Sequence, residues 1–150
     1  MDYFFPYAQK LLGRVGIRCR LEVIEPLPAG NLNAEERHEF LHAYKEALNN
    51  ILRHSGASQV QITMSASEGN LLIRIADNGC GLEDAAGNGA PRGIGRAGRC
   101  VLGRIIPRGA HHGLAGMRER LLRLGGRCEI TGSTGNGTTV TFIIPFQAKA

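Results

Sequence analysis

The sequence has no tryptophan and only three tyrosines, and 5% of its 150 residues are aromatic. The net charge of +5 by itself suggests a nucleic-acid partner, but the scarcity of aromatic residues argues against one. Basic grooves that bind single strands usually carry aromatic side chains on which the bases stack. One glycine-rich segment contains five arginines with no aromatic residue among them: Arg92, Arg96, Arg99, Arg104 and Arg108. We therefore expect no direct contact with nucleic acid.

Two further absences limit the class of protein. The four cysteines contain no C-x-x-C pair, so we expect reduced thiols and neither a zinc knuckle nor a disulfide framework. No apolar run approaches the roughly 20 residues that span a bilayer, and the N-terminus lacks the order of a signal peptide. The chain is expected to be cytoplasmic and free of membrane contact, although a longer protein that carries it can be membrane-anchored.

Composition and periodicity predict a single α+β domain over residues 1–150. The sequence is 43% hydrophobic and 21% charged, as in globular proteins. Helical periodicity predicts helices at residues 4–12, 34–54 and 113–124. Alternating apolar residues predict strands at 19–27, 59–66 and 71–78 and a final hairpin within 127–146. This order predicts a two-layer α/β sandwich, with a mixed sheet of about five strands and helices on one face.

Three local features refine this prediction. Asn33 and Glu36 have the spacing of a capping arrangement at the start of the helix 34–54. A four-residue loop, 67–70, is expected between the strands 59–66 and 71–78. The glycine-rich segment 82–112 has no sustained period and is predicted to be a long loop, with a short helix near 100–106.

The segment HEFLH, residues 38–42, matches the zinc-protease motif H-E-x-x-H on a predicted helix. This spacing places two imidazoles on one face and would make Glu39 the general base. A catalytic zinc also needs a third ligand, and the longer form of the motif requires Gly and His where Lys45 and Leu48 stand. We interpret the segment as an ordinary helix surface, and the zinc protease remains a rival hypothesis.

Two nucleotide-binding motifs can be assessed in the same way. Residues 93–98 match G-x-G-x-x-G, but no strand precedes them, and a dinucleotide site needs strand, turn and helix together. No G-x-x-x-x-G-K-[ST] occurs anywhere in the chain. If the protein uses ATP, it does so without a P-loop.

A dispersed set of residues is more informative, and it begins on the helix 34–54. Glu46 and Asn50 are four residues apart and therefore share one helix face, with Arg53 and His54 a turn further on. A carboxylate one turn from a carboxamide can hold a base beside an oxygen ligand for Mg²⁺.

The set continues at three later turns. Asp77 ends a strand, where its carboxylate can accept a hydrogen bond from an amino group, and Gly79 and Gly81 let a ligand lie against the backbone. The residues 113–116 begin a helix whose free N–H groups favour phosphate. The residues 135–139 open the final strand. Four such signals in this order predict one nucleotide site.

These segments resemble the GHKL (Bergerat-fold) ATPases. The closest likeness is to the catalytic ATP-binding domain of bacterial sensor histidine kinases, of the subfamily that pairs with LuxR-type response regulators. KEALNNILRHSGA resembles the N box, and ADNGCGL, HHGLAGMRERLLRLGG and GNGTTVTFIIP resemble the three glycine boxes. The resemblance covers residues 4–146. It implies the Bergerat fold and a protein histidine kinase that uses Mg-ATP and passes the γ-phosphate to a histidine on a separate dimerisation domain, in two-component signal transduction.

The resemblance also implies a role for each matched residue. Glu46 would polarise the attacking group, and Asn50 would ligate Mg²⁺. Asp77 would bind the adenine amino group, with Thr138 assisting through water. The other implied ATP-binding residues are Arg53 and His54 near phosphates or ribose, Gly79 and Gly81 beside the base, and Gly113, Leu114 and Gly116 on the phosphate side.

Two departures from the family pattern stand out. The segment 82–112, which corresponds to the ATP lid, is longer and more basic than the subfamily usually carries, and His111 stands where many relatives have a glycine. No dimerising hairpin with a phosphoacceptor histidine precedes residue 1, so we expect the acceptor elsewhere in the same full-length polypeptide and the isolated domain to be a monomer. His38 is rejected as the acceptor because it lies eight residues before Glu46, about 12 Å along a rigid helix.

Two alternatives share this fold. One is a stand-alone GHKL serine kinase of the anti-sigma-factor type, which naturally lacks the hairpin. The other is a degenerate nucleotide-binding module that acts through protein contacts. The run MRERLLRLGG favours the histidine-kinase pattern over the first, and the presence of Glu46, Asn50 and Asp77 argues against the second.

Overall fold

The fold was analysed in a computed structural model, which describes residues 3–24, 27, 32–81 and 110–145, the first three residues of the last range by backbone alone. The helices are α1 (Phe4–Gly13), α2 (Ala34–Asn50) and α3 (Ala110–Arg123), and a π-helical turn, η1 (Ile51–Ser55), continues α2. The strands are β1 (Arg18–Val23), β2 (Gln59–Ser67), β3 (Asn70–Asp77), β4 (Arg127–Gly132) and β5 (Thr138–Pro145).

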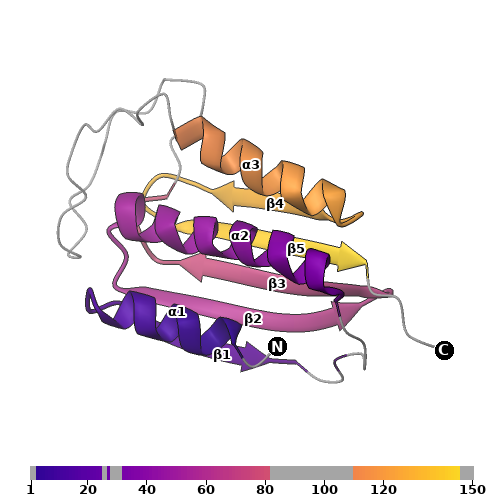
Figure 1. Cartoon of the computed structure of the whole chain (residues 1–150). Helices are drawn as coiled ribbons and strands as arrows, with labels where there is room; N and C mark the ends of the chain where they lie inside the picture. The colour runs from indigo at the N-terminus through magenta and orange to yellow at the C-terminus, as the bar shows by residue number, and fades with distance from the viewer. Residues whose placement is uncertain (1–2, 25–26, 28–31, 82–109, 146–150) are drawn as a thin grey trace.

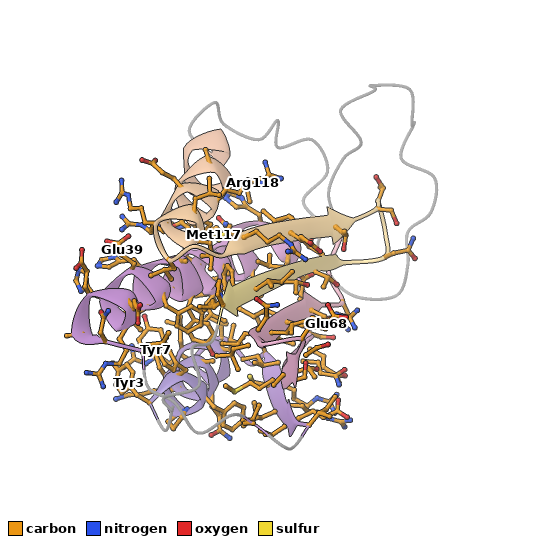
Figure 2. The ribbon with its side chains drawn as sticks, turned by 90° about the vertical axis from the view of Figure 1, so that its right-hand side faces the viewer. Tyr3, Tyr7, Glu39, Glu68, Met117 and Arg118 are labelled. Atoms are coloured by element: carbon orange, nitrogen blue, oxygen red, sulfur yellow. The ribbon has the colours of Figure 1, made fainter. Side chains whose placement is uncertain are left out.

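The five strands form one mixed sheet in the order β1-β2-β3-β5-β4. β1 runs parallel to β2, and the other neighbouring pairs are antiparallel. All three helices cover the same face of this sheet (Figure 1). The two layers are also clear end-on in Figure 2. The predicted α+β sandwich is therefore confirmed.

The core lies between the central helix and the middle strands. Alternate residues of β2 and β3 point to the helices and are buried, as the period of two requires. On α2, Phe40 packs edge-on against Phe142 of β5, with ring centroids 5.7 Å apart. Tyr44 is 1% exposed, and its hydroxyl donates a hydrogen bond of 3.0 Å to the carbonyl of Phe4. This contact ties α1 to α2.

The start of α2 is as expected and its end is not. The Glu36 N–H donates to Asn33 Oδ1 at 2.8 Å, and the Asn33 N–H donates to Glu36 Oε2 at 2.7 Å, which completes the capping box. The α-helix was expected to reach residue 54 but ends at Asn50, where η1 begins. The Ser55 hydroxyl donates to the carbonyl of Ile51 at 2.8 Å within this turn. Gly56, with φ +61°, then ends the helix.

Three other boundaries differ from the prediction. β1 ends at Val23 rather than at residue 27. The hairpin between β2 and β3 has a two-residue turn instead of a four-residue loop, because Glu68 and Gly69 both have positive φ, which matches the twist of the strands. α3 begins at Ala110, so the last three residues of the expected loop 82–112 are helical.

Several expected features lie outside the described residues. These are the rest of that loop, the short helix near 100–106, the G-x-G-x-x-G match at 93–98 and the five arginines from Arg92 to Arg108.

Candidate functional site

Segments far apart in the sequence meet at one end of the molecule. The end of α2 with η1, the end of β3 and the beginnings of α3 and β5 all lie at the left of Figure 1. These segments carry every residue that the sequence assigned to the site. The topology thus brings the four predicted boxes together.

Asp77, the last residue of β3, is held by backbone donors. The Gly79 N–H donates to Asp77 Oδ1 at 2.8 Å, and the backbone N–H of Thr138 also bonds to this carboxyl group. Burial raises the pKa of Asp77, and these two hydrogen bonds oppose the rise. Thr138 thus contacts Asp77 through its backbone in this structure. An ionised carboxylate in this position is a pure acceptor, suited to an amino group.

The glycines around Asp77 allow backbone segments to touch each other. A Cβ on Gly79 would collide with the carbonyl of Ser55, and a Cβ on Gly137 would collide with the carbonyl of Asp77 itself. Gly81, with φ +77°, lies equally close to the carbonyl of Ser133. Their role was expected to be close approach to a ligand. In this structure their missing side chains let η1, the end of β3 and the β4–β5 turn pack together.

Asn78 is a residue that the sequence analysis did not single out. Its Oδ1 accepts hydrogen bonds from the backbone N–H groups of Ser58 and Gln59, at 3.0 and 2.9 Å. Its Nδ2 donates to the Ser58 hydroxyl at 3.0 Å. These bonds join the end of β3 to the start of β2, directly beside Asp77. The only sequence signal was the Asp-Asn-Gly turn, in which Asn side chains commonly bond to backbone.

The face of α2 that carries Glu46 and Asn50 looks towards α3 and the strand ends. Gly113 of α3 lies directly on the Glu46 carboxyl group, which a Cβ at that position would strike. The Nδ2 atom of Asn50 is buried and has no hydrogen-bond partner among the described residues. The oxygen of the same carboxamide is a ligand type that suits a hard cation such as Mg²⁺. Arg53 and His54 are exposed on η1.

α2 and α3 run in opposite directions, and between them lies an open cavity of about 280 Å³. Its lining residues are His42, Ala43, Glu46, Gly113, Gly116, Met117 and Arg120. At the end of the cavity that is farther from Asp77, Arg120 Nη1 lies 3.0 Å from Glu39 Oε2. Arg123 Nη1 lies 3.6 Å from the same oxygen atom. Figure 2 shows Glu39 on α2 at this side of the helix layer and Met117 on α3 above it.

These contacts bear on the H-E-x-x-H segment. Glu39 is occupied by two arginines rather than directed at a metal. The rings of His38 and His42 have centroids 4.5 Å apart. The pKa of His42 is lowered, chiefly by desolvation and further by the nearby positive charges of His38, Arg120 and Lys45. Within the described residues, no group of three or more His, Cys, Asp or Glu side chains is placed to hold a metal ion. The third ligand that a zinc protease needs is thus missing from this part of the chain.

Cys19 and Cys128, on β1 and β4, are partly buried and are not joined to each other by a disulfide. Burial raises the pKa of Cys19 and of Cys128 to about 11, so both stay protonated at neutral pH.

Among the helices that the structure describes, none has the length and apolar character needed to cross a membrane.

A family model described as histidine kinase-, DNA gyrase B- and HSP90-like ATPase matches residues 35–148. The chain belongs to this family of ATPases. It is an ATPase domain of the kind found in sensor histidine kinases, as similar proteins of known name indicate. The nitrate/nitrite sensor protein NarQ of Escherichia coli K12 is 33% identical over 116 residues, which are 77% of this chain and 17% of NarQ. NarX of the same strain is 29% identical over 119 residues, 78% of this chain and 17% of NarX.

A further relative agrees with this assignment, and a solved structure shares the fold. The sensor histidine kinase MctS of Rhizobium johnstonii is 30% identical over 118 residues, 79% of this chain and 22% of MctS. This ATPase domain therefore spans about a fifth of the length of such relatives. Its fold matches the histidine kinase domain of the blue-light activated kinase EL346 of Erythrobacter litoralis, with a TM-score of 0.66 at 20% identity, over 97% of this chain and 60% of that one.

Proposed function

We propose that this domain binds Mg-ATP at the end of the sheet where Asp77 lies and transfers the γ-phosphate to a histidine on a dimerisation domain of the same polypeptide. The phosphoryl group would then pass to a response regulator of the LuxR type, in cytoplasmic two-component signalling. The observation that carries the proposal is the Asp77 carboxylate, held by two backbone N–H groups beside the face of α2 that bears Glu46 and Asn50.

We infer that the groups along this end follow the order of the parts of ATP. Asp77 would accept a hydrogen bond from the adenine amino group, with Gly79 and Gly81 beneath the base and Thr138 beside it. Arg53 and His54, exposed on η1, would face ribose or phosphates. The phosphates would extend towards Gly113, Leu114 and Gly116 in the first half of α3.

Asn50 and Glu46 would act at the phosphate end. The Nδ2 atom of Asn50 has no hydrogen-bond partner among the described residues, and the oxygen of the same carboxamide would be a ligand for Mg²⁺. When bound, Mg²⁺ would neutralise the charge of the phosphates. Glu46 precedes Asn50 by four residues, so it lies about 6 Å from Asn50 along the axis of α2, towards the N-terminus of the helix.

In the proposed transfer step, Glu46 acts as the base. The lone pair of one acceptor imidazole nitrogen attacks the γ-phosphorus and forms an N–P bond. The bond from the γ-phosphorus to the bridging oxygen breaks, and its electron pair leaves with ADP. The proton on the other imidazole nitrogen passes to the Glu46 carboxylate. Positioning and charge neutralisation supply most of the acceleration in such reactions.

Calorimetric titration with a non-hydrolysable ATP analogue tests this function. Binding of one analogue per chain is expected, tighter in the presence of Mg²⁺. Asp77→Asn is expected to weaken it by about 1.5–3 kcal/mol, the worth of a hydrogen bond to a charged group. No binding by the folded parent would refute the nucleotide site and favour a degenerate interaction module. Transfer to serine instead of histidine in the presence of a partner protein would favour the serine kinase.

A further inference from the structure

The cavity between α2 and α3 continues beyond Glu46, on the side away from Asp77. Its volume of about 280 Å³ is just below the roughly 300–1,000 Å³ of pockets that hold small molecules. Glu46 and Gly113 line one end of it, and His42 and Arg120 line the other. A cavity of this size suits a single side chain better than a whole nucleotide.

The cavity begins at the proposed phosphate contacts Glu46, Gly113 and Gly116 and extends away from Asn50 to His42 and Arg120. At 1.5 Å per residue, His42 lies about 6 Å from Glu46 and about 12 Å from Asn50 along the helix axis. A phosphate that shares a cation with Asn50 can therefore reach Glu46 but not His42. In phosphoryl transfer the attacking and leaving groups lie roughly in line on opposite sides of the phosphorus. The acceptor must thus approach from the side of Glu46 that faces away from the adenine, where the cavity lies.

We propose that this cavity receives the phosphoacceptor histidine of the dimerisation domain and that His42 and Arg120 are positioning residues for it. The proposal rests on the function proposed above and adds roles for two residues: His42, which precedes the segment that resembles the N box, and Arg120, which lies in the segment that resembles the second glycine box. Neither residue is assigned to ATP.

Both side chains have the chemistry for such a contact. His42 is exposed, and its lowered pKa leaves a neutral imidazole that can donate one hydrogen bond and accept another. The side chain of Arg120 is 36% exposed and lies against Glu39, which is 17% exposed. This ion pair holds the planar guanidinium in place, and its further N–H donors suit a carbonyl or carboxylate of a partner.

The chain offers matched controls for both residues. His38 lies one turn before His42 on α2, and their rings are in contact, but His38 is not among the residues that line the cavity. Arg123 shares Glu39 with Arg120 but is likewise absent from the cavity wall. Replacing a control residue therefore removes the same kind of side chain next to the cavity without removing a residue that lines it.

A transfer experiment in trans tests the proposal. The acceptor is the full-length kinase with Asp77→Asn, assayed at an ATP concentration too low to load that variant. The domain described here is added with Mg-ATP labelled at the γ-phosphate, and phosphohistidine is measured against acceptor concentration. Affinity for a non-hydrolysable ATP analogue is measured on each domain variant by calorimetry.

Arg120→Ala is expected to raise the KM for the acceptor about tenfold, as removal of a charge-assisted hydrogen bond does, and His42→Ala about fivefold, as removal of a hydrogen bond between neutral groups does. The analogue affinity should stay within about twofold of the parent, Arg120→Lys should recover part of the loss, and His38→Ala and Arg123→Ala should behave as the parent. An unchanged KM for the acceptor, or an equal loss in the controls, would overturn the proposal. A parallel loss of analogue affinity would also overturn it, because the residues would then belong to the nucleotide site. A parent domain that binds no analogue, or that binds it and phosphorylates no histidine, would refute the proposed function itself.

Discussion

Gly79, at the end of β3, lies with its α-carbon against the backbone carbonyl of Ser55 in η1. The Cys80 N–H donates to the same carbonyl at 2.8 Å. The π-helical turn and the end of β3 are thus joined backbone to backbone, immediately beside Asp77.

This contact predicts that Gly79→Ala destabilises the fold by about 1–3 kcal/mol, the usual cost of forcing extra volume into a packed site. Its Cβ would meet backbone atoms, which cannot rotate away as a side chain can. Urea unfolding measures the loss. Gly116→Ala is the matched control, because no atom lies within 4 Å of its added Cβ and alanine favours a helix by about 0.5–1 kcal/mol. Equal stability of Gly79→Ala and the parent would contradict the contact.

The free energy of unfolding should fall as the pH rises through the pKa of Asp77. Burial raises its pKa in the folded state above the value near 3.9 of an unfolded chain. Its contribution to stability is therefore fully present below that unfolded value and is lost as the pH rises through the folded pKa. Asp77→Asn removes this dependence, so the variant should gain stability relative to the parent between acidic and neutral pH. Urea unfolding of both proteins across this range provides the test, and a constant difference would contradict the raised pKa.

Asn50→Ala should remove the effect of Mg²⁺ on nucleotide binding. The carboxamide of Asn50 has no protein partner for its buried Nδ2 among the described residues, so its loss should cost little stability. Calorimetry should find that Mg²⁺ tightens binding of the ATP analogue to the parent but not to the variant. Adenosine should bind both equally. Asn49→Ala, the neighbouring asparagine, should respond to Mg²⁺ as the parent does. Retention of the Mg²⁺ effect in Asn50→Ala would exclude Asn50 as a ligand.

Glu39→Gln should lower the free energy of unfolding by about 0.5–1 kcal/mol, because Arg120 and Arg123 lose their shared carboxylate. The loss should shrink at high salt, which screens exposed ion pairs. Unfolding at low and high salt measures both effects. Affinity for the ATP analogue should not change. Peptidase activity that disappears in Glu39→Gln and in His38→Ala would instead restore the zinc-protease hypothesis.

Much of the local structure follows from short-range patterns in the sequence. The capping box of Asn33 and Glu36 and the glycines at the end of α3 are local signals, and the helices begin or end close to where these residues predict. The error at residues 67–70 is also local. A turn of only Glu68 and Gly69 needs two positive φ angles, and the sequence analysis did not weigh a non-glycine residue in that conformation.

The candidate site was predicted only in part. Asp77, Glu46 and Asn50 have side chains whose chemistry is visible in the sequence. Asn50 is the last residue of α2 and Asp77 the last residue of β3, and these two elements end on the same side of the molecule (Figure 1). Asn78 escaped notice because its partners, Ser58 and Gln59, lie about 20 residues away in sequence. The interpretation of Gly79 was incomplete for the same reason. What a glycine accommodates depends on the segment that faces it.

The sequence by itself determined the order of helices and strands, the family and the residue types at the four boxes, because hydrophobic period, caps and motif spacing act over a few neighbours. Only the tertiary structure decided how α2 and α3 align. Their antiparallel packing sets Gly113 on Glu46 and Arg120 beside Glu39, 67 and 81 positions apart in sequence. Such long-range contacts depend on how two helix faces pack over a shared sheet, and they created the cavity between the two helices.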